Sequence, residues 1–348
     1  MKVLVVDDSA YQRLTLASAL REHPNVAGVD TAASGEEAIR KVLSSPFDLV
    51  TLDIEMPGVD GFAVLRWLMT HRPLPVLIVS ERRHERTALL ALELGAFDVI
   101  GKANARTGGL AAWKPLLFEA VEKAAAIRLD VLTRLARAGH DASPRRRRQP
   151  SVEMRRPADD RLSGVVVAAS TGGPPALRDL LLAFTPRPVV VAIAQHIPPP
   201  FTRSLAARLA AATGWDAREA VDGMEVPPGA VAVAPGGSHL RLARDGARVV
   251  ARLSADRKRR WCPSADALFA SAAEVFGDRA VAVVLTGMGD DGAQGARAVA
   301  DAGGAVICES RDSAVIAGMP DAAARAVPRA LRLPLAEIGA ELARRVAR

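Results

Sequence analysis

Short apolar runs alternate with amphipathic stretches along most of the 348-residue chain. Between residues 1 and 138 this pattern occurs five times, and the last amphipathic stretch predicts a helix at about 113–137. Such alternation is typical of a parallel sheet whose strands are joined by helices. The five predicted strands cover residues 2–6, 26–31, 48–52, 75–79 and 97–100.

The second half repeats this pattern with more strands. Three of its runs contain only apolar residues and glycine: GVVVAA (164–169), VVVAIA (189–194) and AVAVVL (280–285). Continuous apolar runs are typical of central parallel strands that are buried on both faces. Shorter alternating pieces predict an antiparallel insertion at one edge, and they cover 217–221, 230–234, 239–243 and 247–251.

Residues 139–162 differ in composition from both halves. They lack apolar periodicity, carry three prolines and belong to a basic stretch, residues 134–161, with nine arginines and four acids. A polar stretch that repels itself is typical of a solvated linker. We therefore expect one domain at 1–125, with its last helix continuing to about 138, a linker at 139–162, and a second domain at 163–348.

Charge and composition exclude several classes of protein. The net charge is +7, but the basic stretch supplies +5 of it and the chain has only 13 aromatic residues, so we expect no nucleic-acid partner. Two cysteines cannot form a disulfide scaffold. The apolar runs are far shorter than the roughly 18–20 residues that span a bilayer, and the start MKVLVVDD is unlike a signal peptide. We expect a cytoplasmic protein without membrane insertion.

Polar residues follow the predicted strands of the first half. Asp7 and Asp8 follow the first strand, Asp53 the third, Ser80 ends the fourth and Lys102 follows the fifth. The carboxyl ends of parallel strands face one crevice. Three carboxylates there require a hard cation, and oxygen ligands suit Mg²⁺. A lysine and a hydroxyl beside them could hold a phosphoryl group on Asp53.

The motifs VLVVDDS, LDIEMPGVDG and VLIVS, with the late lysine, resemble the receiver domain of two-component response regulators. The resemblance covers about residues 1–125 and implies a flavodoxin-like fold with a five-stranded parallel sheet. It implies that Asp53 is the phosphoacceptor and that Asp8 and the Glu55 carbonyl hold Mg²⁺, supported by Asp7. Ser80 and Lys102 are then the switch hydroxyl and the phosphate-binding lysine.

Two residues depart from the receiver pattern. Ala103 follows the lysine where receivers usually have proline, and Val99 stands where a switch aromatic is expected. The first departure affects the geometry of the loop, and the second argues against the usual aromatic-rotamer switch.

The second half has its own candidate chemistry. Ser170 lies on a glycine turn before a helix opened by two prolines, His196 follows the next apolar run, and Asp290 and Asp291 follow a third. Because these positions follow predicted central strands, the side chains can converge. A serine nucleophile, a histidine base and an orienting aspartate form a hydrolytic triad. His239 could line a substrate groove, and Cys262 has no evident base partner.

The same region also supports a rival interpretation. The sequence TGMGDDGAQG contains G-x-G-x-x-G at Gly287, Gly289 and Gly292, followed by Glu309 beyond the next apolar run. This spacing matches a dinucleotide-binding fingerprint and would indicate a receiver-controlled oxidoreductase. The two aspartates inside the loop oppose it, because they would repel a pyrophosphate. A third alternative is a non-catalytic, phosphorylation-dependent binding regulator.

Five motifs in order resemble the catalytic domain of the chemotaxis protein-glutamate methylesterase/glutamine deamidase family (CheB type). They are ASTGGPPAL, QHIPPPFT, VAPGGSHL, CPSAD and LTGMGDDG, and the resemblance spans about 163–345. It implies a larger doubly wound α/β domain with a mainly parallel sheet and an antiparallel edge. It also implies that Asp291 rather than Asp290 is the catalytic acid, that Met288 donates its backbone N–H to the oxyanion, and that Thr171 flanks the nucleophile.

The resemblance implies a phosphorylation-regulated serine hydrolase that gives adaptation in chemotaxis signalling. Its substrates would be glutamate methyl esters on methyl-accepting chemotaxis receptors, with release of methanol, and particular receptor glutamines. A chemotaxis histidine kinase would be the phosphodonor. Hydrolysis would need no cofactor, whereas phosphorylation of the receiver would need Mg²⁺.

Overall fold

The computed structural model describes residues 1–80, 85–102, 109–134, 162–256 and 259–346. The chain divides into two compact units, Met1–Asp141 and Ala142–Arg348, each with its own parallel sheet. The expected linker at 139–162 lies, apart from its last residue, outside the described residues, as does Ala103. No helix in the described ranges is long and apolar enough to cross a membrane.

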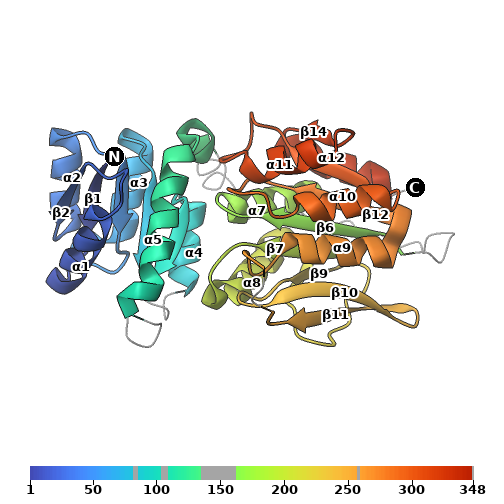
Figure 1. Ribbon diagram of the computed structural model, residues 1–348. Coiled ribbons are helices and arrows are strands. Elements are labelled where there is room, and N and C mark those ends of the chain that lie inside the picture. Colours follow the sequence, from blue (N-terminus) through green and yellow to red (C-terminus); the bar gives the residue numbers. More distant parts are fainter. Residues whose placement is uncertain (81–84, 103–108, 135–161, 257–258, 347–348) are drawn as a thin grey trace. The chain divides into compact units, whose positions relative to one another are not determined.

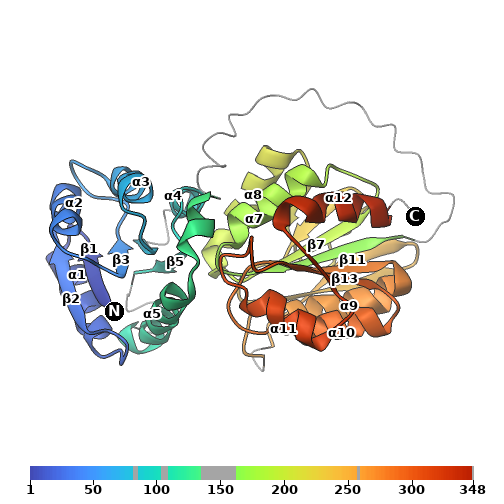
Figure 2. The same cartoon turned by 90° about the horizontal axis from the view of Figure 1, so that it is seen from above.

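The first unit is a five-stranded parallel sheet in the order β2-β1-β3-β4-β5, as expected for a receiver fold. Helices α1 and α5 cover one face and α2 and α3 the other (Figure 2). The strands are β1 (Lys2–Val6), β2 (Gly28–Ala32), β3 (Leu49–Leu52), β4 (Val76–Ser80) and β5 (Asp98–Gly101). The helices are α1 (Ala10–Arg21), α2 (Gly35–Ser44), α3 (Gly61–His71), α4 (Glu85–Glu93) and α5 (Gly109–Ala126).

The last helix of this unit differs from the single helix expected at about 113–137. Helix α5 begins earlier, at Gly109, and ends at Ala126, and further helical residues follow at 129–134. Pro115 lies inside α5, where its backbone nitrogen has no hydrogen to donate to the carbonyl one turn earlier.

The second unit has a seven-stranded parallel sheet in the order β14-β13-β12-β6-β7-β9-β8 (Figure 1). Helices α9, α10 and α11 cover one face and α7, α8 and α12 the other (Figure 2). The sheet strands are β6 (Gly164–Ala169), β7 (Val190–Gln195), β8 (Asp216–Glu219), β9 (Ala230–Val233), β12 (Ala280–Val284), β13 (Ala305–Glu309) and β14 (Leu331–Leu333). The helices are α7 (Gly173–Ala183), α8 (Thr202–Thr213), α9 (Ala265–Phe276), α10 (Ala293–Asp301), α11 (Gly318–Ala326) and α12 (Leu335–Val346).

The three all-apolar runs form the adjacent central strands β12, β6 and β7, whose residues are buried throughout. The antiparallel part of the fold is smaller than expected. Among the described strands, only β10 (His239–Asp245) and β11 (Arg248–Ser254) pair antiparallel, as a separate two-stranded sheet, and one isolated antiparallel bridge joins Glu225 to Val250. Strands β8 and β9 run parallel at one side of the main sheet. The sequence pattern did not distinguish them, because side chains alternate between the two faces of a strand whether its neighbour runs parallel or antiparallel.

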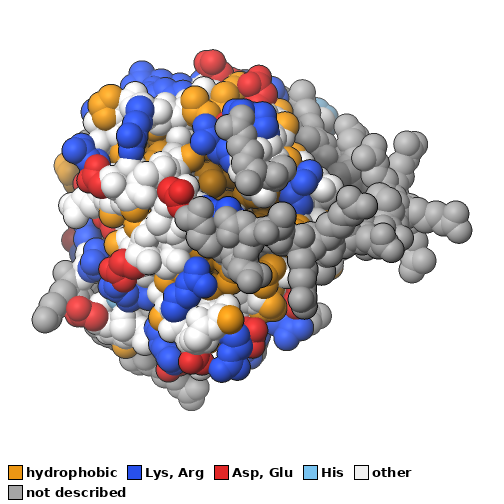
Figure 3. All heavy atoms as spheres, turned by 90° about the vertical axis from the view of Figure 1, so that its right-hand side faces the viewer, with side chains coloured by type: hydrophobic (Ala, Val, Ile, Leu, Met, Phe, Trp, Pro, Cys, Tyr) orange, Lys and Arg blue, Asp and Glu red, His pale blue; other side chains and the backbone are white. Residues whose placement is uncertain are grey.

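The exposed surface carries charges of both signs. On the face drawn in Figure 3, Lys and Arg side chains lie scattered among acidic and apolar ones rather than in one continuous basic surface.

The central strands bring the polar residues that follow them to one edge of the sheet. Ser170 directly follows β6, His196 directly follows β7, and Asp291 lies in the loop between β12 and α10. The register pairs Ala169 with Gln195, so Ser170 and His196 occupy the next positions on neighbouring strands.

Behind this edge lies a buried glutamate, Glu309, at the end of β13. Its residue is 2% exposed, and its carboxylate accepts the N–H of Thr286 at 2.8 Å and the hydroxyl of Ser313 at 2.9 Å. Burial raises the pKa of Glu309 to about 7, and the hydrogen bonds from Ser313 and Thr286 only partly offset the loss of water. Glu309 thereby fixes the backbone at the start of the loop that carries Asp291.

Replacing Glu309 by Gln should remove a pH dependence of stability. A glutamate whose pKa rises from 4.5 to about 7 on folding stabilises the fold fully below about pH 4.5, and this contribution is lost as pH rises through about 7. Relative to the Gln variant, the wild-type chain should lose on the order of 3 kcal/mol of unfolding free energy across that window. Denaturant unfolding at about pH 5 and about pH 8 measures the change.

The matched control is Glu337→Gln, which alters an exposed glutamate on α12 and should leave the pH dependence as in the wild type. The same pH dependence in the Glu309 variant and the wild type would contradict the prediction.

Candidate active site

The turn after β6 holds Ser170 against the loop that follows β12. The N–H of Ser170 donates to the carbonyl of Thr286 at 2.9 Å, and Gln195 Nε2 donates to the carbonyl of Ser170 at 2.8 Å. A Cβ atom on Gly287 would lie 2.7 Å from the Cβ of Ser170, so only glycine permits this approach. Gly172 adopts a left-handed conformation at φ 78° and is the N-cap of α7. Ser170 itself is 2% exposed.

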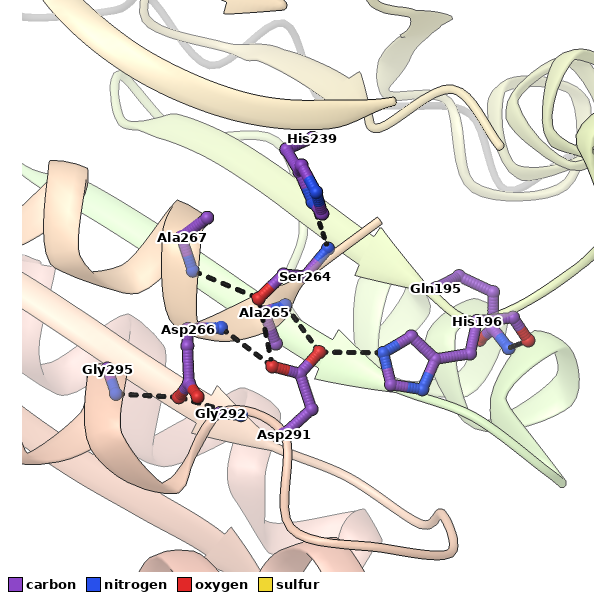
Figure 4. Close-up of polar contacts among 10 residues, drawn as sticks. All are labelled: Gln195, His196, His239, Ser264, Ala265, Asp266, Ala267, Asp291, Gly292 and Gly295. Atoms are coloured by element: carbon purple, nitrogen blue, oxygen red, sulfur yellow. Dashed lines mark hydrogen bonds and ion pairs between the residues drawn. The ribbon is translucent and has the colours of Figure 1, made fainter. Parts of the chain in front are cut away.

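His196 contacts the acid that the resemblance selected. Its Nε2 lies 2.8 Å from Asp291 Oδ2 (Figure 4), while its Nδ1 is buried and has no hydrogen-bond partner within the described part of the chain. With Nε2–H donating to the carboxylate, Nδ1 of the neutral ring carries a free lone pair. No hydrogen bond joins Ser170 to His196 among the described residues, so the structure brings together the acid–base half of the triad.

Asp291 is surrounded by hydrogen-bond donors at the start of α9. Its carboxylate accepts the hydroxyl of Ser264 at 3.1 Å and the N–H groups of Ala265 and Asp266 at 2.7 and 3.1 Å (Figure 4). Burial acts to raise the pKa of Asp291, but hydrogen bonding and charge attraction to His196, with these N–H groups, hold it below its ordinary value. The helix N-terminus adds favourable dipole charge. Asp291 is therefore an ionised carboxylate in the folded protein.

Asp290 has a different environment from its neighbour. Its side chain is exposed, whereas Asp291 is 4% exposed. Only Asp291 is in a position to orient His196.

Sequence reasoning did not find the residues that support Asp291 through hydrogen bonds, Ser264 and His239. Ser264 caps α9 by accepting the N–H of Ala267, and its own N–H donates to Nδ1 of His239. The Nε2–H of His239 donates to the carbonyl of Asp256 at 2.6 Å. His239 is 2% exposed, so it supports Ser264 rather than lining a groove. The Ser-x-Asp sequence before an apolar run was the available signal for the cap, but no local pattern could join residues 239 and 264.

The side chain of Asp266 occupies the N-terminus of α10, where the pyrophosphate of a dinucleotide would bind. Its Oδ1 accepts the N–H groups of Gly292 and Gly295 at 3.0 and 2.7 Å, at the start of α10 (Figure 4). Burial raises the pKa of Asp266. The helix N-terminus that would bind a pyrophosphate is thus occupied by a carboxylate, and Glu309 is buried away from any ribose. The oxidoreductase alternative is not supported.

Two further residues were expected beside the reacting carbonyl, Met288 as the oxyanion donor and Thr171 next to the nucleophile. Thr171 follows the candidate nucleophile, and its hydroxyl is buried without a hydrogen-bond partner in the described ranges. Met288 lies between Gly287, which packs against Ser170, and Gly289. Their roles stay predictions.

The first unit places its acidic residues as expected at one edge of its sheet. Ligand atoms of Asp7, Asp8 and Asp53 all lie within 4.8 Å of one another. Lys102 Nζ lies 2.7 Å from Asp53 Oδ2 and 2.8 Å from Asp7 Oδ2. Burial raises the pKa of Asp53 despite the opposing effect of Lys102. Three carboxylates with one ammonium form an all-oxygen donor set with excess negative charge, which fits Mg²⁺.

The remaining receiver positions lie around this cluster. Ser80 ends β4 and is 1% exposed, and the N–H of Glu55 lies 3.4 Å from Asp53 Oδ1. Val99 is buried in β5, where it pairs with Ile78.

Comparison with known proteins identifies both units. Residues 165–342 match the CheB methylesterase family model, and residues 3–112 match the response regulator receiver domain. The chain belongs to the CheB methylesterase family. It is therefore a hydrolase with an attached receiver domain.

Named relatives cover nearly the whole chain. It is 42% identical to protein-glutamate methylesterase/protein-glutamine glutaminase 1 of Myxococcus xanthus, over 99% of this chain and 96% of that protein. It is 44% identical to protein-glutamate methylesterase/protein-glutamine glutaminase 6 of Anaeromyxobacter dehalogenans, over 93% and 89%. The crystal structure of the Thermotoga maritima CheB methylesterase catalytic domain matches with a TM-score of 0.50 and 38% identity, over 52% of this chain and 97% of that one.

Substitution of the two adjacent aspartates should have unequal effects on esterase activity. Asp291→Asn places an amide NH₂ among four donors, so it should favour the wrong imidazole tautomer and lower kcat on the order of 10⁴-fold. Asp290→Asn, at the exposed neighbour, should change kcat by less than about threefold. Steady-state kinetics of the two purified variants test this ranking, and the reverse order would show that the acid has been misassigned.

Proposed function

We propose that the second unit hydrolyses glutamate γ-methyl esters on methyl-accepting chemotaxis receptors and deamidates particular receptor glutamines. The observation that carries this proposal is the buried contact between His196 Nε2 and Asp291, which leaves Nδ1 as an unpaired base one strand away from Ser170. The names of the relatives supply the substrate class.

In the proposed mechanism Ser170 Oγ attacks the ester carbonyl while Nδ1 of His196 takes the hydroxyl proton. Asp291 stabilises the imidazolium through the Nε2–H contact. The two ring nitrogens thus exchange the roles that they have in chymotrypsin. The Met288 N–H and Thr171 stabilise the oxyanion. The imidazolium then protonates the departing methoxide, and methanol leaves an acyl-enzyme on Ser170.

The second half of the reaction regenerates the enzyme. Nδ1 of His196 takes a proton from water, the resulting hydroxide attacks the acyl carbon, and Ser170 leaves with the proton returned by the imidazolium. The product is a free glutamate side chain. A glutamine follows the same path with ammonia as the leaving group, and neither path needs a cofactor.

We further propose that the first unit controls this reaction through phosphorylation of Asp53 by a chemotaxis histidine kinase. Asp7, Asp8, Asp53 and the Glu55 carbonyl would hold Mg²⁺, which when bound neutralises phosphoryl and carboxylate charge. Lys102 and the Ser80 hydroxyl would contact phosphoryl oxygens. The receiver at 1–125, with its last helix to about 138, the linker at 139–162 and the catalytic domain at 163–348 would work together in the cytoplasm.

The nucleophile is tested by Ser170→Ala. Incubation of the purified chain with methylated receptor should release methanol, and the variant should be slower by roughly 10⁴-fold or more because no acyl-enzyme can form. The substitution removes one small side-chain oxygen, so circular dichroism should show an unchanged fold. Near-normal methanol release by the alanine variant would exclude Ser170 as the nucleophile.

Regulation is tested by Asp53→Asn with a small-molecule phosphodonor and Mg²⁺. The donor should raise the wild-type rate by about 5- to 150-fold, the range of ordinary coupling energies, and should leave the variant at its basal rate. Asp48→Asn is the matched control, because Asp48 precedes β3 whereas Asp53 follows it. A donor effect that persists in the Asp53 variant would place the phosphorylation elsewhere.

A further inference from the structure

An indole ring lies flat against the imidazole of His196. The ring centroids of Trp261 and His196 are 5.1 Å apart, and the two planes differ by 9°. Trp261 lies in the segment before α9, close in sequence to the residues that hold Asp291. One short stretch of chain, residues 261–266, therefore contacts both members of the acid–base pair. Trp261 stacks on the imidazole of His196, and residues 264–266 bind the carboxylate of Asp291.

The same indole also lies against the loop after β12. Gly289 has φ 95°, and a Cβ atom placed on it would lie 3.0 Å from Cζ2 of Trp261. Glycine at this position therefore admits both the loop conformation and the tryptophan. Met288 precedes Gly289 in this loop, so Trp261 lies against both the base and the loop that carries the proposed oxyanion donor.

Hydrogen bonding does not account for the place of Trp261. Its indole N–H is buried and has no acceptor within the described residues, which is unfavourable. The position of Trp261 is therefore explained by its ring contacts. The imidazole of His196 lies parallel to the indole, and the guanidinium of the exposed Arg260 lies 5.0 Å from the indole centroid.

The His196 ring needs such a contact. Within the described part of the chain it makes one side-chain hydrogen bond, from Nε2 to Asp291, and its Nδ1 makes none. A ring held at one nitrogen can still rotate about the axis through that bond, which would turn Nδ1 away from its neighbour. A parallel aromatic surface restricts this rotation, since tilting the imidazole would bring it into the indole.

We propose that Trp261 is a positioning residue that fixes the plane of the His196 imidazole so that Nδ1 faces Ser170. This inference rests on the proposed esterase function. The π face of the indole also stabilises the imidazolium that forms during attack, as the carboxylate of Asp291 does. The positive charge of Arg260 opposes this effect, but Arg260 is exposed and solvent screens its charge.

The test compares Trp261→Leu with Trp261→Phe. Leucine keeps apolar volume but removes the flat aromatic face, so kcat for methanol release should fall by about 2- to 30-fold while KM stays unchanged. Phenylalanine keeps the face and loses only an N–H without a partner, so it should restore kcat to within about twofold of wild type. An unchanged kcat in the leucine variant, or an equal loss in both folded variants, would overturn the proposal.

A spectroscopic measurement separates this proposal from the esterase function. In NMR spectra of the full chain, the carbon-bound ring protons of His196 should be shifted upfield by the indole, less so in Trp261→Phe and not at all in Trp261→Leu. This readout needs no substrate, so a chain without esterase activity would refute the function and leave the stacking testable. Unshifted His196 protons in the wild-type chain refute the proposal even if the leucine variant does not fold.

Discussion

The carboxylate of Asp291 is the group on which the catalytic unit depends. Removing a charged carboxylate from water costs several kcal/mol unless donors replace the lost solvent. Here the start of α9 supplies three donors and His196 a fourth. Because the same carboxylate binds the helix and the imidazole, the position of α9 and the position of Nε2 of the base depend on one group.

The glycine-rich loop shows how one spacing can serve two chemistries. Gly287 admits Ser170, Gly289 admits Trp261, and Gly292 has φ 95° where the chain enters α10. A dinucleotide loop uses glycines for similar reasons, a tight turn and close backbone approach. The difference lies outside the loop: Asp266 occupies the helix N-terminus here, so the backbone that could bind a pyrophosphate binds a carboxylate of the same chain.

Much of the fold could be predicted because it depends on local patterns. The all-apolar runs became β6, β7 and β12, and the polar residues after them meet because parallel strands end at one edge. Whether β8 and β9 pair parallel or antiparallel could not be predicted, since side chains alternate between the two faces of a strand in both kinds of pairing.

The candidate site was predictable only in part. The choice between Asp290 and Asp291 came from resemblance alone, because spacing treats adjacent aspartates alike. The contacts of His239 with Ser264 and of Trp261 with His196 join residues 25 and 65 positions apart, a distance at which no helical or strand period relates them.

The site is built on the ends of central strands, and this determines how it responds to local unfolding. The amide of Ser170 donates to Thr286 and that of His196 to Ala169, next to central strands of the seven-stranded sheet rather than next to its outermost strands. Opening reactions that fray edges and surface loops do not reach such hydrogen bonds, which exchange their protons with solvent only through large-scale unfolding. We expect these two amides to be among the slowest in the unit to exchange, so catalytic geometry and global fold should be lost in the same transition.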